Sequence, residues 1–119
     1  MLRLIKTETV ALPVKLRLPT ATAGVFNEGS ITAQVVVLSK DQLKDLADAE
    51  TSDADYIKTI VKDVEGLGDA QGNPIKGEAA LAEVLNGDWS SFLQNAILAA
   101  YFEQFGEARV KNSKTSRGR

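Results

Sequence analysis

Residues 89–108, WSSFLQNAILAAYFEQFGEA, decide the fold that we expect of this chain. Every residue from Ala96 to Phe102 is apolar or aromatic, and the helical spacing of apolar residues predicts a long helix from Trp89 to Ala108, capped by Asp88. A chain of 119 residues has a modest core. We therefore expect either that the whole apolar surface packs inside the monomer or that one stripe of it meets a partner. The two stripes are Leu93, Ala96, Ile97, Ala100 and Tyr101, and Trp89, Phe92, Ala96, Ala99 and Phe102.

Three shorter helices are predicted upstream of this one. Ser39 and Gln42 form a capping box that starts a helix running to about residue 50. Ser52 or Asp53 is expected to cap a second helix. The helical spacing of apolar residues continues through Val64, and Gly66 and Gly68 are expected to end the helix. A turn over residues 69–74 then leads to a short helix at residues 78–85.

The first part of the chain predicts an antiparallel pair of strands. Residues 8–18 alternate strictly between apolar and other positions, which indicates a half-buried strand, and Pro13 within it indicates an edge or a bulge. Residues 19–30 predict a loop, and residues 31–38 predict the second strand. Such a pair needs a helix packed on it or a third strand to be stable. Leu2, Leu4 and Ile5 are expected to extend the same sheet.

The expected fold class is therefore α+β, with an N-terminal antiparallel strand pair followed by a bundle of about four helices. We expect a single domain over residues 1–108, with a β region at 1–38 and a helical region at 39–108. Residues 109–119 carry five basic residues and no acid, so they predict a basic tail that is disordered in isolation. Since the whole chain carries −2 and this tail +5, residues 1–108 carry −7.

Composition argues against catalysis. The chain has no cysteine and no histidine, which excludes disulfides, zinc sites built from those residues, cysteine nucleophiles and Ser-His-Asp triads. Asp63, Glu65 and Asp69 surround the glycine turn, but their spacing does not match a calcium-binding loop, and turn chemistry explains Asp69 better. The glycine spacing there follows a helical pattern, which argues against dinucleotide binding. We expect no catalytic residue, no cofactor and no metal.

The expected compartment is the cytoplasm. No apolar run approaches the length needed to span a bilayer, so we expect no membrane partner, and the apolar cluster at residues 2–5 is too short for a signal peptide.

The order of elements resembles the tail assembly chaperones of long-tailed bacteriophages and prophages. The resemblance covers residues 31–112 and is carried by four segments. They are Ser39-Lys-Asp-Gln-Leu-Lys-Asp-Leu46, the helix and acidic glycine turn of residues 57–75, the short Leu-rich helix of residues 78–85, and the terminal helix ending Glu107-Ala-Arg-Val-Lys-Asn112.

This resemblance implies a non-catalytic role in virion morphogenesis. Chaperones of this family bind the long helical tape measure protein in the host cell cytoplasm, keep it soluble, yield to the tail tube protein and are absent from the mature virion. The resemblance also implies a homo-oligomer, as a ring or spiral. For partner or self-association we expect contacts through Phe92, Ile97, Tyr101, Phe102 and Phe105.

Two alternatives stay open at the level of sequence. One is a structural tail or head–tail joining subunit, which would remain in the finished particle. The other is a small nucleic-acid-associated module that uses the basic tail. The acidic body and the absence of a nucleic-acid-binding motif argue against this second alternative.

Overall fold

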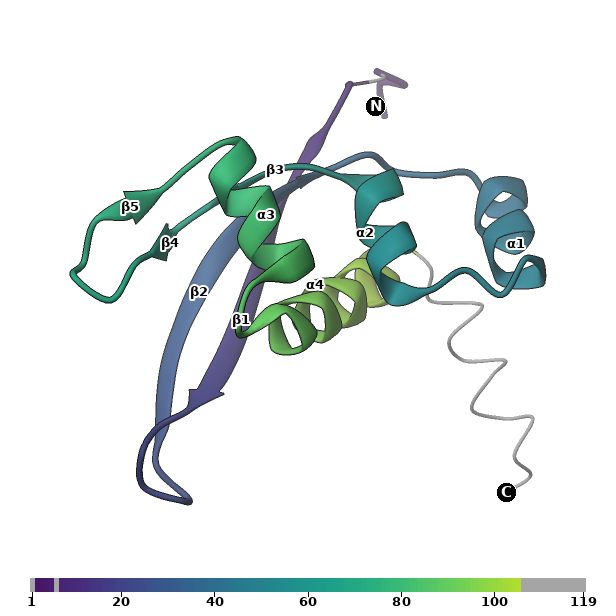
Figure 1. Cartoon of the computed structure of the whole chain (residues 1–119). Coiled ribbons are helices and arrows are strands. Elements are labelled where there is room, and N and C mark those ends of the chain that lie inside the picture. Colours follow the sequence, from purple (N-terminus) through teal and green to yellow (C-terminus); the bar gives the residue numbers. More distant parts are fainter. Residues whose placement is uncertain (1, 6, 106–119) are drawn as a thin grey trace.

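The computed structural model describes residues 2–5 and 7–105. Its centre is a three-stranded antiparallel sheet in the order β1-β2-β3 (Figure 1). The strands are β1 (Val10–Pro19), β2 (Phe26–Val35) and β3 (Val61–Glu65). Together with four helices they confirm the α+β class and the N-terminal strand pair.

Helix α4 (Ser90–Phe105) packs against β1. Both α2 (Asp53–Ile60) and α3 (Glu78–Asn86) pack against α4, while α1 (Lys40–Asp48) lies apart at one side (Figure 1). A small hairpin, formed by β4 (Leu67–Gly68) and β5 (Pro74–Ile75), follows β3. The predicted long helix starts one residue later than expected, and its last residues, 106–108, lie outside the described part of the chain, as does the tail at 109–119.

Local hydrogen bonds explain where the helices begin. The Gln42 amide N–H donates to Ser39 Oγ at 3.1 Å, and the Ser39 N–H donates to Gln42 Oε1 at 2.8 Å, so the predicted capping box is confirmed. Ser52 caps α2 by accepting from the Asp55 N–H at 3.2 Å. The Leu93 N–H donates to the Trp89 carbonyl, which places the start of α4 one residue beyond the predicted Asp88 cap.

Strand β1 follows its sequence pattern. Leu12 and Val14 are buried in the core, and Val10, Leu16 and Leu18 are half-buried on the same face. Pro13 is exposed on an edge strand, as predicted, because β1 pairs with β2 alone.

The prediction that the second helix continues through Val64 is wrong. The helix ends at Ile60, and Val61–Glu65 pairs with β2 as strand β3. The register shifts there, since Val35 faces Val61 but Gln34 faces Asp63, which leaves Lys62 as an extra residue. This bulge turns both valines of β3 toward the core, and a spacing of three between them imitates a helix.

Three boundaries in the β region also differ from the predictions. Residues 26–30, predicted as loop, belong to β2 and pair with residues 15–19 of β1. Residues 36–38, predicted as strand, lie beyond the end of β2 and lead to α1. Leu2, Leu4 and Ile5 do not extend the sheet but stand outside it, highly exposed.

The buried side chains of the sheet and helices form one cluster, to which α4 contributes Leu93, Ile97, Leu98 and Tyr101. Its largest fully buried members are Tyr101, Ile57, Ile60, Ile97, Val14, Val35, Val64 and Val84.

Candidate interaction surface

The five predicted contact residues all lie on α4, but they fall in three different environments. Ile97 and Tyr101 are both 0% exposed, so within this monomer they have no surface to offer to another chain. The Tyr101 hydroxyl donates to the Val36 carbonyl at 2.8 Å and accepts from the Leu38 N–H at 3.0 Å. Burial raises the pKa of Tyr101, and the hydrogen bond from Leu38 opposes that shift. These two residues are corrected to core residues, because the sheet and the segment before α1 cover them.

Phe102 and Phe105 are half-buried in an aromatic cluster near the end of α4. The ring centroids of Tyr56 and Phe102 are 5.6 Å apart, and those of Tyr101 and Phe105 are 5.2 Å apart, all in edge-on geometry. Of these two contacts, the Tyr56–Phe102 pair joins α2 to α4, and the Tyr101–Phe105 pair lies within α4.

Phe92 is the one predicted contact residue that the monomer leaves open, at 42% exposed. It forms an edge-on pair with Trp89, with ring centroids 5.6 Å apart, and Trp89 is 41% exposed. The sequence placed Trp89 on the same apolar stripe as Phe92, but position in a helix does not tell which neighbours cover a side chain.

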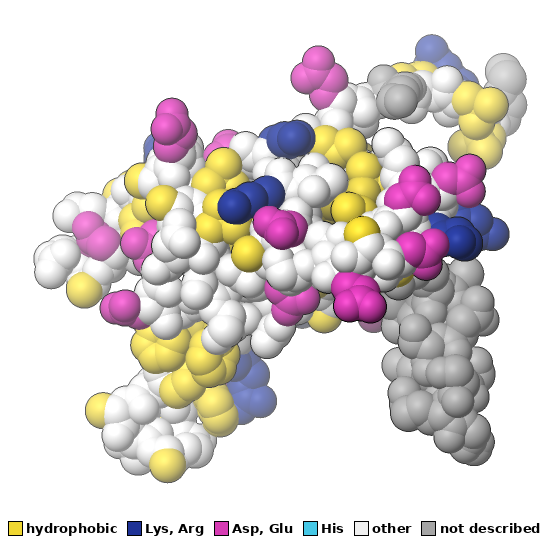
Figure 2. Space-filling view, turned by 45° about the vertical axis from the view of Figure 1, so that its right-hand side comes forward, with side chains coloured by type: hydrophobic (Ala, Val, Ile, Leu, Met, Phe, Trp, Pro, Cys, Tyr) yellow, Lys and Arg dark blue, Asp and Glu magenta, His cyan; other side chains and the backbone are white. Residues whose placement is uncertain are grey.

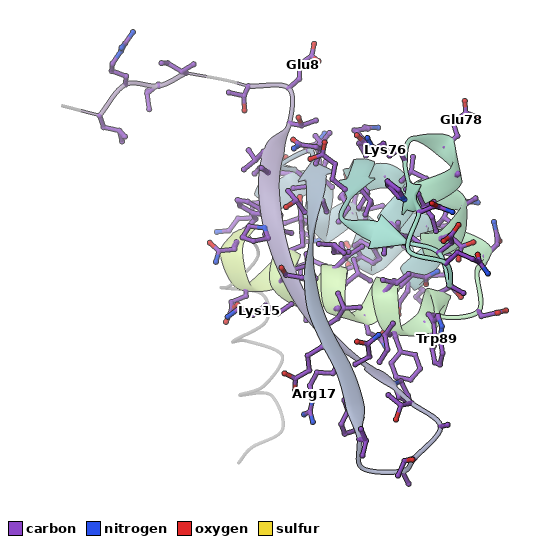
Figure 3. All side chains as sticks on the ribbon, turned by 90° about the vertical axis from the view of Figure 1, so that its left-hand side faces the viewer. Glu8, Lys15, Arg17, Lys76, Glu78 and Trp89 are labelled. Atoms are coloured by element: carbon purple, nitrogen blue, oxygen red, sulfur yellow. The ribbon has the colours of Figure 1, made fainter. Side chains whose placement is uncertain are left out.

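A projecting hairpin stands beside this aromatic pair. We call residues 15–30 the arm; the strands of the arm run past the body of the molecule (Figures 1 and 3). Within the arm, Arg17 pairs with Glu28 at 3.1 Å, and the Arg17 guanidinium lies 4.1 Å from the centre of the Phe26 ring. Hydrophobic side chains gather over the arm, with Lys or Arg side chains beside them (Figure 2).

The inner face of the arm and the first half of α4 enclose a groove of about 700 Å³. Leu16 and Gly29, which face each other across β1 and β2, line it together with Phe92 and Ala96 of α4. The groove is hollow partly because Gly29 has no side chain, and a Cβ added there would meet nothing within 4 Å. Lys15, Arg17, Glu28 and Ser30 also line the groove, so its lining is partly polar and charged. In Figure 3, Trp89 lies beside the arm, on the side of α4. This groove with its aromatic pair is the candidate interaction surface.

The glycine turn has a second hollow of about 440 Å³, lined mainly by residues 63–68 and 74–77. Asp69 Oδ1 accepts from the N–H groups of Gln71 and Asn73, both at 2.9 Å, so this carboxylate is used by the turn that the sequence predicted. Among residues 2–5 and 7–105, no group of three or more acidic side chains is placed to hold a metal ion.

Comparisons with family models, with curated proteins and with solved structures give no match for this chain. In the described part of the chain, no helix has both the length and the apolar character needed to cross a bilayer. The groove and the resemblance in the sequence are therefore the two indications of function.

Proposed function

We propose that this chain is a non-catalytic tail assembly chaperone of a long-tailed bacteriophage or prophage. It binds the tape measure protein and holds it soluble until tail tube subunits replace it. The resemblance in sequence over residues 31–112 supports the family. The observation that carries the binding role is the exposed Trp89–Phe92 pair beside the groove.

The surface suits an apolar helix of a client. Helix-binding grooves take the apolar face of an amphipathic helix between two walls, and here α4 and the arm supply these walls. Trp and Phe are effective anchors because each brings a large apolar area with little conformational entropy to lose. Many copies along one long client would add their separate weak contacts through effective concentration.

The test is solubility of the client. A helical segment of the tape measure protein encoded beside this chain is co-expressed with the wild type, with Trp89→Ser and with Val37→Ser. Val37 is a matched control because it is 45% exposed but lies on the segment between β2 and α1. We expect the wild type and Val37→Ser to keep the client soluble. Trp89→Ser should weaken binding at least about tenfold, since buried aromatic anchors contribute about 2 kcal/mol or more.

Two results would contradict the proposal. A client equally soluble with and without the wild-type chain would remove the chaperone role. Detection of the chain in purified virions, at the level of a structural protein, would replace that role with a permanent tail or head–tail joining subunit.

A further inference from the structure

We propose that the client-binding surface continues across the arm, from the groove beside α4 into a second hollow beside β4, with Gly29 where the two meet. One amphipathic helix of the client lies across the arm and contacts both hollows. This longer site rests on the proposed function, because its occupant is the client.

The second hollow has a volume of about 200 Å³ and lies between the arm and β4. Leu18 of the arm and Leu67 of β4 are half-buried, and both line it. Leu16 and Gly29 line this hollow and also the groove beside Phe92, so the two hollows adjoin at these residues. In Figure 1, the hairpin of β4 and β5 lies on one side of β1 and β2, and α4 lies on the other. The open apolar surface of the arm is therefore longer than the groove alone.

Gly29 has no side chain although the monomer does not require a glycine there. It lies inside β2, where a glycine weakens a strand because it packs nothing and loses more conformational entropy on folding. Its φ is not positive, and the pairing of β1 with β2 runs from Val10 to Pro19 without a register shift. A Cβ at this position would meet nothing within 4 Å in the described chain. Neither backbone conformation, nor a bulge, nor a close neighbour accounts for this glycine, whereas glycines inside strands also mark places where a ligand approaches the backbone closely.

The lining of the two hollows fits an amphipathic helix better than a wholly apolar one. Leu16 and Leu18 alternate with charged neighbours along β1, and Arg17 pairs with Glu28 across the arm at 3.1 Å. An apolar helix face packs on the two leucines and on the backbone of Gly29, and its polar flanks lie beside the charged residues.

A strand of the client is a poorer occupant than a helix. Pro13 and Pro19 are both on edge strand β1, six residues apart, so their nitrogens face the same side of the strand. Neither proline has an N–H, so the free edge of β1 lacks donors at two positions. A helix needs no donors from this edge, because its backbone groups bond within the helix.

Two variants test the two parts of the site. Gly29→Val places a side chain where the hollows meet, and Ala11→Val is its control, on the exposed face of β1. Leu18→Ser removes apolar surface from the second hollow alone. Val25→Ser is the control for Leu18→Ser, because Val25 is 54% exposed near the tip of the arm and lines neither hollow.

Fluorescence anisotropy measures binding of a labelled peptide, a helical segment of the tape measure protein encoded beside this chain. We expect the wild type and both controls to bind equally, and Gly29→Val and Leu18→Ser to bind at least about tenfold more weakly. The midpoint of urea unfolding of Gly29→Val should equal or exceed that of the wild type, because valine favours a strand and its Cβ has open space. If this variant is instead less stable, Leu18→Ser and a label in the second hollow decide.

A single cysteine provides that label, since the chain has none of its own. Asn27 lines the second hollow and faces Leu18 across the arm, so Asn27→Cys carries an environment-sensitive fluorophore there, and Val25→Cys carries the control label. Saturating peptide should shift the emission at residue 27 to shorter wavelength and leave that at residue 25 unchanged.

The outcomes separate this site from the proposed function. A peptide that binds the wild type but shifts the two labels alike, or binds Leu18→Ser or a stably folded Gly29→Val as tightly as the wild type, would overturn the longer site alone. The role of the Trp89–Phe92 pair would then still stand. A client segment that the wild type neither binds nor keeps soluble would overturn both.

Discussion

At the scale of single residues, Tyr101 joins α4 to the segment between β2 and α1, a contact that no pattern in the sequence indicates. Its ring is 0% exposed in the core, and its hydroxyl makes hydrogen bonds to the backbone of Val36 and Leu38. These two residues lie in the segment that leaves the sheet and enters α1. One side chain of α4 thus satisfies two backbone groups and fixes where the chain leaves β2.

Tyr101→Phe keeps the ring but leaves those backbone groups without this partner. We expect a loss of about 1–3 kcal/mol in the free energy of unfolding, measured by urea denaturation at neutral pH. Tyr56→Phe is the control, because its hydroxyl makes no hydrogen bond within the described part of the chain, and it should lose less. Equal losses for the two variants would contradict the role assigned to the Tyr101 hydroxyl.

The stability lost in Tyr101→Phe should also depend on pH. Because burial raises the pKa of Tyr101 in the folded state, the unfolded chain loses this proton first as the pH rises. The contribution is complete below the ordinary tyrosine pKa of about 10 and is lost as the pH rises through the folded-state value. The stability difference between the wild type and Tyr101→Phe should therefore shrink above about pH 10.

At the scale of elements, the end of β3 depends on close contact with β2. Gly66 follows β3 with a φ of +103°, a conformation that residues with a side chain rarely adopt. A Cβ at this position would lie 3.2 Å from Ile31 Cα and 3.3 Å from the Ser30 carbonyl oxygen. Both are backbone atoms of β2, so the crowding cannot be relieved by rotating a side chain.

Gly66→Ala and Gly72→Ala separate crowding from backbone conformation. Gly72 also has a positive φ, +85°, but a Cβ there meets nothing within 4 Å. We expect Gly72→Ala to lose about 1 kcal/mol from its strained φ alone, and Gly66→Ala to lose at least about 1 kcal/mol more. Thermal and urea unfolding measure both. Equal losses would show that the approach of Gly66 to β2 does not limit packing.

These elements also show what a sequence alone can predict. The caps at Ser39 and Ser52 and the alternation of β1 are local, so they were predicted correctly. Strand β3 was missed because its bulge gives a strand the spacing of a helix. The first half of β2 was missed because residues 26–30 are exposed, so no alternation of apolar and polar residues marks them.

The candidate interaction surface was predictable only in part, for a related reason. The two apolar stripes of α4 are visible in the sequence, and they include Phe92. Which stripe stays open depends on where the arm and the segment before α1 lie, and these contacts join residues far apart in the chain. Ile97 and Tyr101 were therefore predicted as contact residues although the monomer buries them.

At the scale of the whole molecule, stability is unevenly distributed. Helix α4 touches the sheet, α2 and α3, whereas α1 makes few contacts with any other element and stands at one side (Figure 1). Within α1 only Leu43 is buried, and the exposed Lys44–Asp48 pair, 2.9 Å apart, adds little in water. Elements with few buried contacts open at a lower free energy than the core does.

Native-state hydrogen exchange tests this distribution directly. We expect the protected amides of α1 to open at a free energy at least about 2 kcal/mol below those of α4, with little dependence on urea, as in local opening. Leu43→Ala should lower protection in α1 while leaving α4 unchanged, because it removes the one buried side chain of α1. Ile97→Ala should lower protection throughout, since this residue is fully buried in the core cluster that joins the sheet and the helices. Equal opening free energies and equal urea dependence in α1 and α4 would instead mean that the helices unfold as one cooperative unit, with Tyr101 coupling α1 to the core despite its few contacts.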